Sequence, residues 1–333
     1  MGEPALIRVS YSSLGTFSSC TRKFELDKLY PRVAREGEDF YAADVGKALH
    51  AGYQSWLTHK SEQAAIWSFM CEFPYEAEYS QSNDYRSFEA ALATLEAMLA
   101  YHPMSEYQLA SIRRPWTAQE YLEAESRGEV LNRNESPVVP AIEVPFEIRF
   151  KGLEIAPCER YPDGAQFAFT GFMDALMQNL MTDVYRTLDI KTTRQKLGDL
   201  TAKFKFDTQQ VPYGIVVDHV AKGAIDSFEV LYLNAYIDLV NPDVRFEPFM
   251  KTRTDIQEWA MNKVIQFQQI ARFAGLDYFP RTENGCLFYN RPCRYLEVCQ
   301  SRDRKAVLDW LTLGKETTPD TFEPWIVAEL EVE

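Results

Sequence analysis

The sequence predicts an α/β protein in which a mixed central β-sheet is flanked by helices. Three observations predict it. Apolar residues recur at helical spacing in the first third of the chain, and alternation of apolar and polar residues begins at 138. A strand–helix–strand order then follows over residues 184–235. The chain has 333 residues, of which 46% are hydrophobic, so it is long enough to bury a large core.

The N-terminal part, residues 1–137, is expected to be helical. Between 45 and 59, Leu49, Tyr53 and Leu57 share one helix face, and His50 lies beside that apolar stripe. Ser10 or Ser12 is expected to cap a short helix that runs toward Cys20. Further helices are predicted at 61–72 and 86–101, and the polar stretch 103–137 is predicted to be irregular or an insertion.

The central part, residues 138–252, should hold the sheet. Strands are predicted at 138–150, 167–177, 184–190 and 227–235, with a helix at 207–222 between the last two. The prolines of the first strand favour an edge position, and Pro212 fits the helix if it stands in the first turn. The C-terminal part, residues 253–333, is expected to contain helices at 253–274 and 303–313 and a fraying acidic tail after Lys315.

Charge and composition exclude several classes of protein. A net charge of −14 argues against a protein that coats nucleic acid, although six basic residues lie between Arg186 and Lys205 against two acids. That stretch is equally well explained as a solvated face. The chain has no apolar run long enough for a membrane span and no secretory signal, so we expect a cytoplasmic protein without membrane contact. It also lacks a Walker-type phosphate loop, a Gly-x-Ser-x-Gly elbow and a zinc-protease histidine pair.

Two carboxylates and a lysine stand on the predicted apolar strands, where burying charge is costly. Asp174 lies late in one strand and Asp189 at the end of the next, so both can reach one ion. Lys191 follows Asp189 on the same strand face. Mg²⁺ or Mn²⁺ held by carboxylates supports phosphodiester hydrolysis. The alternative is an ion pair of Asp189 with Lys191 at a strand end, with Asp174 capping a turn.

The order of motifs resembles the PD-(D/E)xK nuclease superfamily and, within it, the RecB-type exonucleases. The matching segments are Val45–His50, Thr170–Asp174, Leu188–Thr193 and Gln209–Tyr213. The resemblance implies a restriction-endonuclease-like core in which His50, Asp174, Asp189 and the Ile190 carbonyl bind the metal. It further implies that Lys191 positions or activates the attacking water, and that Gln209 and Tyr213 orient DNA or the lysine.

The six cysteines are distributed unevenly. Cys71 and Cys158 are isolated and are expected to be small core residues. The remaining four, Cys20, Cys286, Cys293 and Cys299, suffice for a [4Fe–4S] cluster or a zinc ion. In RecB-type members with this layout, one cysteine precedes the core, three follow it, and the cluster joins the two ends of the chain.

One departure from that family pattern concerns the spacing of the late cysteines. Members often place two residues between the first two of them, whereas six separate Cys286 from Cys293. Cys158 would be the substitute ligand if Cys20 did not serve.

The function expected from these features is a metal-dependent exonuclease that acts on DNA ends and favours single-stranded DNA. By resemblance, it is similar to CRISPR adaptation nucleases and to viral recombination exonucleases. An integrase, an annealing protein or another recombination factor is the expected partner. Two alternatives remain: a non-catalytic subunit that binds DNA ends or a partner while keeping the fold and cluster, and a zinc-stapled structural protein.

Overall fold

The computed structural model describes most of the chain as two compact units. Unit 1 comprises residues 1–38, 145–171 and 258–333, and unit 2 comprises residues 39–144 and 172–257. The residues described are 4–29, 41–75, 87–101, 106–132, 135–182, 184–193, 207–221, 227–282, 286–288, 291–293, 295, 296, 299 and 322–331. The helix predicted at 303–313 lies outside them. Among the described residues, no helix is long and apolar enough to cross a membrane.

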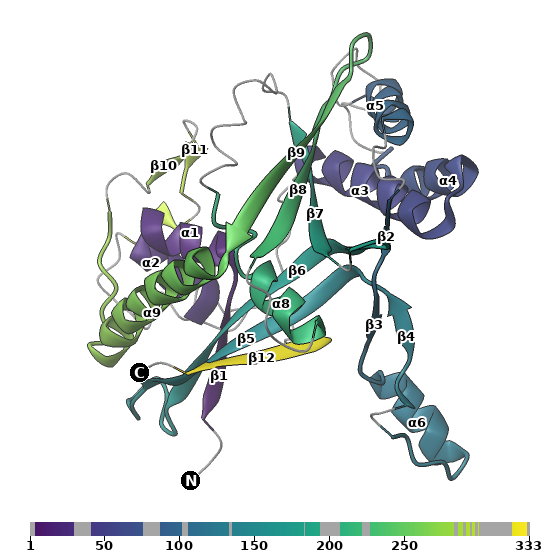
Figure 1. The fold of residues 1–333 in the computed structure, drawn as a ribbon. Helices are drawn as coiled ribbons and strands as arrows, with labels where there is room; N and C mark the ends of the chain where they lie inside the picture. The colour runs from purple at the N-terminus through teal and green to yellow at the C-terminus, as the bar shows by residue number, and fades with distance from the viewer. Residues whose placement is uncertain are drawn as a thin grey trace. The chain divides into compact units, whose positions relative to one another are not determined.

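Unit 2 is built on a mixed sheet, as predicted (Figure 1). Its strands are β6 (Ala165–Asn179), β7 (Tyr185–Thr193), β8 (Ser227–Tyr236) and β9 (Asp243–Thr252), joined by the short β2 (Tyr107–Leu109). β6 pairs antiparallel with β7, β7 parallel with β8, and β8 antiparallel with β9. The parallel pair is the one that the strand–helix–strand order predicted.

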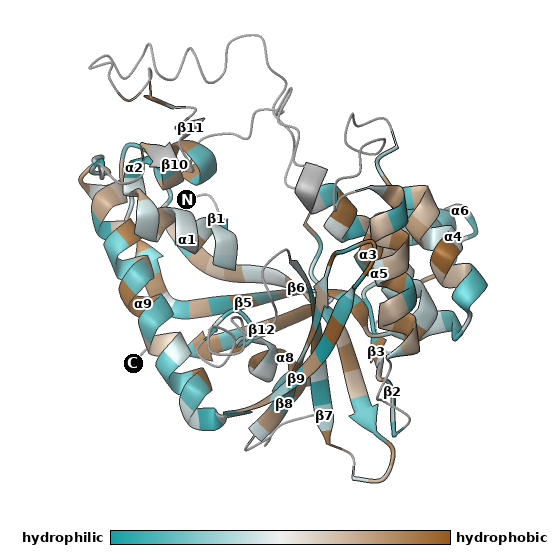
Figure 2. Ribbon diagram, turned by 90° about the horizontal axis from the view of Figure 1, so that it is seen from above, coloured by the Kyte–Doolittle hydropathy of each residue, from teal (hydrophilic) through white to brown (hydrophobic). Residues whose placement is uncertain are grey.

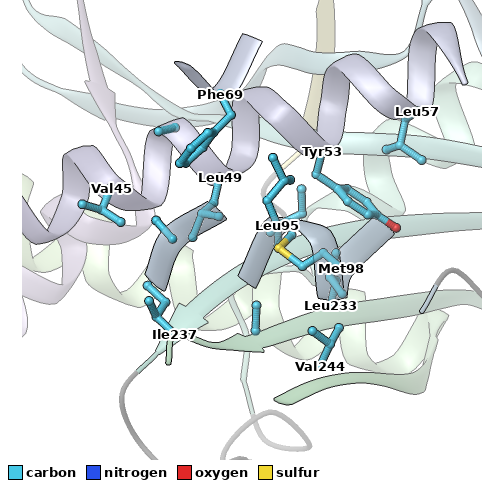
Figure 3. Packing of buried hydrophobic residues seen from close by; sticks show 14 of the residues in the cluster. Val45, Leu49, Tyr53, Leu57, Phe69, Leu95, Met98, Leu233, Ile237 and Val244 are labelled. Carbon is cyan, nitrogen blue, oxygen red and sulfur yellow. The ribbon is translucent and has the colours of Figure 1, made fainter. Parts of the chain in front are cut away.

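Two helices pack on one face of this sheet, α3 (Tyr41–His59) and α5 (Phe88–Ala100), and α4 (Glu62–Glu72) packs against α3 and α5. Ser61 and Ser87 cap α4 and α5 through their side-chain oxygens. Figure 3 shows their apolar side chains pointing toward one another and toward residues of β8 and β9. Leu49 and Tyr53 of α3 are fully buried there, so the face predicted from helical spacing is the face that packs.

The opposite face of β8 is covered by α8 (Tyr213–Val220), which begins directly after Pro212. The helix is shorter than predicted because residues 209–212 form turns. Gly214 allows close packing: a Cβ there would lie 2.4 Å from the Phe228 ring and 2.6 Å from Ile256. The helix can therefore approach the sheet only with glycine at this position.

The stretch predicted to be irregular contains regular structure. β3 (Ser111–Arg113) pairs with β4 (Val138–Pro140), and α6 (Ala118–Ser126) lies between them in sequence. Thr117 and Glu120 form a capping box at the start of α6, which is a local helix-start signal within this polar stretch.

Unit 1 begins with β1 (Ala5–Val9), α1 (Tyr11–Ser19), α2 (Thr21–Phe24) and a π-helix (Glu25–Leu29). Ser10 caps α1. The later elements are α9 (Arg253–Gly275), whose first residues belong to unit 2, and the short pair β10 (Leu287–Phe288) and β11 (Arg291–Pro292). Figure 2 shows hydrophilic and hydrophobic residues alternating along α9. Phe267 of α9 stacks on Phe167 at a centroid distance of 4.9 Å.

The described part of the tail contains a strand, so the expectation of fraying is wrong for residues 326–331. β12 (Ile326–Glu331) pairs in parallel with β5 (Ile142–Ile155), and Ile326 and Ala328 are buried. Because β12 and β6 flank β5, the edge position predicted from its prolines is wrong. The predicted strand 138–150 is interrupted at Ala141, where the chain passes from β4 to β5.

Candidate metal centre

Two neighbouring strands of unit 2 bring the two predicted aspartates together, although Asp189 stands in the middle of β7 and not at its end as expected. The antiparallel register pairs Ala175 of β6 with Leu188 of β7, so Asp174 and Asp189 are the next residues on the two strands. Asp174 Oδ2 accepts a hydrogen bond from the Ile190 N–H at 2.8 Å. Asp189 is almost completely buried. The carboxylates are therefore fixed by the backbone ladder itself.

A third carboxylate, which the sequence did not single out, completes a possible metal-binding group. One ligand atom from each of His50, Glu143 and Asp174 lies within 4.8 Å of the other two. His50 Nδ1 stands 3.7 Å from Asp174 Oδ2, and the Ile190 backbone hydrogen-bonds with His50. An imidazole and two carboxylates, with the buried Asp189 on the neighbouring strand, fit Mn²⁺ or Mg²⁺.

The electrostatics of the site favour a bound cation. Burial raises the pKa of Asp189 to about 7, and the neighbouring Asp174 charge adds to that rise against the effect of Lys191. Burial likewise raises the pKa of Asp174 to about 6, with a contribution from Glu143. Burial lowers the pKa of His50, which keeps the imidazole in the neutral form that binds metals. A divalent ion would relieve the crowding of negative charge.

Lys191 points to the same strand face as Asp189. Its Nζ lies 2.7 Å from Asp189 Oδ2 and donates a hydrogen bond to Gln209 Oε1 at 3.2 Å. Burial alone would lower the pKa of Lys191, but the charges of Asp189 and its neighbours outweigh it and raise that pKa. The lysine is therefore a fixed cation beside the carboxylates.

Gln209 and Tyr213 occupy the turn and helix start that approach this face. The Gln209 N–H donates to Asp207 Oδ1 at 2.8 Å, which fixes the turn that presents its side chain to Lys191. The Tyr213 hydroxyl donates to the Phe172 carbonyl at 2.9 Å. Burial, together with the nearby aspartates, raises the pKa of Tyr213 well above its usual value. The structure thus joins Gln209 to the lysine and Tyr213 to the Asp174 strand.

Glu143 could not have been found by motif spacing. It stands at the start of β5 with a φ of 47°, a left-handed conformation that glutamate adopts rarely. In the sequence it reads as one polar residue of an alternating strand. Only the crossing of the chain from β4 to β5 brings it to His50.

The predicted cysteine ligands lie in unit 1. Cys20 is buried between α1 and α2, and the Cys293 N–H donates to the Cys286 carbonyl at 2.8 Å. Burial raises the pKa of Cys299, and the charges of Cys293 and Cys20 raise it further. The thiols do not form a metal-ligand group among the described residues, where only the His50 group meets that spacing.

Hydrogen bonds to backbone carbonyls nevertheless join the first and last cysteine segments. Thr21 Oγ1 donates to the Pro280 carbonyl at 2.6 Å, and the Arg22 N–H donates to the same carbonyl at 3.2 Å. Arg281 donates to the Cys299 carbonyl at 2.8 Å. Of the two cysteines expected in the core, Cys71 is exposed, which corrects that expectation, and Cys158 is partly exposed.

A comparison with known families supports the interpretation of the carboxylate group as a nuclease metal site. A family model described as PD-(D/E)XK nuclease superfamily matches residues 8–300. No curated protein matches the sequence. The match covers nearly the whole chain, including His50, both aspartates and the lysine. The chain therefore belongs to the PD-(D/E)XK nuclease superfamily.

Proposed function

We propose that this protein is a metal-dependent DNA exonuclease of the RecB type. The observation that carries the proposal is the convergence of His50, Glu143 and Asp174 within 4.8 Å, on a sheet that places Asp189 and Lys191 beside them. The proposed metal ligands are His50, Asp174, Asp189 and the Ile190 carbonyl, together with Glu143, whose carboxylate lies in the same group.

Each side chain has a task that follows from its surroundings. When bound, a divalent ion would neutralise the phosphoryl oxygens and lower the pKa of its bound water. Lys191 holds a positive charge next to Asp189, where it can orient the attacking water. Gln209 restricts the lysine through its amide oxygen, and Tyr213 fixes the strand that carries Asp174 through the Phe172 carbonyl.

A preference for single-stranded ends is supported by an aromatic side chain at the site. Phe172 is 52% exposed, and strand alternation places it on the same side of β6 as Asp174. An exposed aromatic ring beside a phosphate-binding centre offers a stacking surface for an unpaired base. Residues 194–206, which carry much of the basic stretch, lie outside the described residues.

We further propose that Cys20, Cys286, Cys293 and Cys299 bind a [4Fe–4S] cluster. The hydrogen bonds of Thr21 and Arg22 with Pro280, and of Arg281 with Cys299, support it because they already join the two cysteine-bearing segments. Four thiolates are the ligand set of a [4Fe–4S] cluster, and a cluster held by these segments would stabilise the fold of unit 1. A brown anaerobic preparation that loses its colour in Cys20→Ser supports the cluster, whereas a colourless one containing zinc refutes it.

The proposed biological setting is DNA recombination. The net charge of −14 suits a basic partner, such as an integrase in CRISPR-type adaptation or an annealing protein in viral recombination. The non-catalytic alternative predicts binding of DNA ends without cleavage.

The activity is tested with end-labelled single- and double-stranded DNA and Mn²⁺ or Mg²⁺. We expect Lys191→Ala to abolish cleavage and to leave Mn²⁺ and DNA binding nearly intact, because the lysine acts on the reacting groups and not on the metal. The matched control is Lys151→Ala, which removes an exposed lysine paired with Glu329. Undiminished cleavage by Lys191→Ala would refute the role, and a wild type that binds DNA ends but never cuts would favour the alternative.

A further inference from the structure

One side chain outside the predicted motifs touches the metal-binding group. Gln54 stands on α3 one helical turn after His50, so both residues lie on the same face of the helix. The Gln54 side-chain amide donates a hydrogen bond to Glu143 Oε1. A single helix face therefore supplies His50 directly and reaches the Glu143 carboxylate through Gln54.

The backbone of Glu143 is held by buried neighbours, whereas its side chain is exposed to solvent. Ala141 and Val144, before and after it in the chain, are fully buried. The Ala141 N–H donates to the Ala110 carbonyl, and the Ala141 carbonyl accepts from the Leu176 N–H, both at 2.9 Å. The positive φ of Glu143 is an unfavourable conformation that the surrounding ladder maintains. The side chain itself is exposed, and among the described residues Gln54 is the group that donates to its carboxylate.

An exposed glutamate samples several rotamers, and only some of them face His50 and Asp174. A hydrogen bond that selects the metal-facing rotamer reduces the entropy lost when an ion binds. Groups of this kind, which hold metal ligands without touching the metal, commonly alter metal affinity by 10- to 100-fold. The strained backbone brings Glu143 to the site, and the Gln54 amide orients the Glu143 carboxylate.

We infer that Gln54 is a positioning residue that holds the Glu143 carboxylate ready to bind the divalent ion. The inference rests on the proposed function, because it takes the His50, Glu143 and Asp174 group to be the metal site. It assigns to Gln54 an effect on metal affinity that operates through Glu143 alone.

The test is a double-mutant cycle read by metal binding in the absence of DNA. Binding of Mn²⁺ to chelator-treated protein is measured from the electron paramagnetic resonance signal of the free ion. Gln54→Met keeps the length and helix propensity of the side chain and removes the donor. We expect it to weaken Mn²⁺ binding about tenfold. In a Glu143→Gln background, Gln54→Met should weaken Mn²⁺ binding by less than a further twofold. The effects of the two substitutions are not additive because both act on the same carboxylate.

The matched control is Gln119→Met on α6. It removes an equivalent amide-to-carboxylate hydrogen bond, from Gln119 to Glu123 at 2.8 Å, on an exposed helix face. This variant should bind Mn²⁺ like the wild type. Thermal unfolding of the metal-free Gln54→Met protein should also match the wild type, which shows that the fold is retained.

Three results would overturn the inference in distinguishable ways. Wild-type affinity in Gln54→Met shows that the amide does not position the ligand. An equal loss from Gln54→Met with and without Glu143→Gln shows that its effect does not pass through Glu143. Mn²⁺ binding that is unchanged in Asp174→Asn shows instead that the metal site itself lies elsewhere, and the proposed function fails with it.

Discussion

Asn in place of Asp189 should flatten the pH dependence of stability of the metal-free protein. Burial raises the pKa of Asp189 from 3.8 to about 7. The folded protein therefore holds a proton that the unfolded chain releases between about pH 4 and 7, and the free energy of unfolding falls as the pH rises through that window. At 1.36 kcal/mol per pKa unit, the three-unit shift costs about 4 kcal/mol at pH 8.

The assay is thermal unfolding of chelator-treated protein at pH 5 and pH 8. More than one unit of that shift has already taken effect at pH 5, so about two units, or roughly 2.7 kcal/mol, develop between pH 5 and pH 8. An unfolding entropy of about 2.1 cal/mol/K per residue converts this cost to roughly 4 °C for 333 residues. Between pH 5 and pH 8, the Tm of the wild type should therefore fall by about that much more than the Tm of Asp189→Asn. Mn²⁺ should restore the wild type at pH 8, because the ion offsets the buried charge.

The control is Asp243→Asn, which removes an exposed carboxylate paired with Arg245. Its pH dependence should equal that of the wild type. If Asp189→Asn and the wild type lose the same Tm between pH 5 and pH 8, the Asp189 carboxyl is not a strained buried acid, and the electrostatic argument for a cation at this site is wrong.

Two further substitutions test how α8 supports the site. Gly214→Ala should lower the free energy of unfolding by about 1–3 kcal/mol, measured by urea denaturation, because the new Cβ would lie 2.4 Å from the Phe228 ring. A stability equal to that of the wild type would show that α8 can move away from the sheet. Tyr213→Phe should cost about 1 kcal/mol by removing the donor to the Phe172 carbonyl. It should lower kcat with an unchanged Mn²⁺ affinity, and a selective loss of Mn²⁺ affinity would instead make Tyr213 part of the metal site.

The elements of the site that the sequence predicted are those with a strong local pattern. Leu49 and Tyr53 mark the buried face of α3 by their spacing, and this face places His50 at the sheet. Lys191 follows Asp189 on the same side of β7 by strand alternation alone. Local periodicity was sufficient in both cases because the tertiary packing agrees with it.

The features that were missed depend on contacts between distant segments. Glu143 joins the metal group through a left-handed backbone that only the β4-to-β5 crossing imposes. β9 was overlooked because much of it is exposed and Pro248 interrupts its pattern. β12 has alternating burial at Ile326 and Ala328, but its acidic composition suggested a frayed tail. In each case a pairing partner, and not the segment itself, decides the structure.

Both compact units are assembled from separate stretches of chain, and β5 and β6 each run from one unit into the other. Unit 1 contains residues before 39 and residues after 257. During synthesis it therefore cannot complete its fold until the last segment has left the ribosome. No contiguous fragment contains the metal centre without part of unit 1, because His50 and Asp189 lie on opposite sides of residues 145–171. A catalytic fragment of this nuclease therefore cannot be excised as one continuous segment and moved to another protein. Insertions or deletions inside β5 or β6 should disturb both units at once.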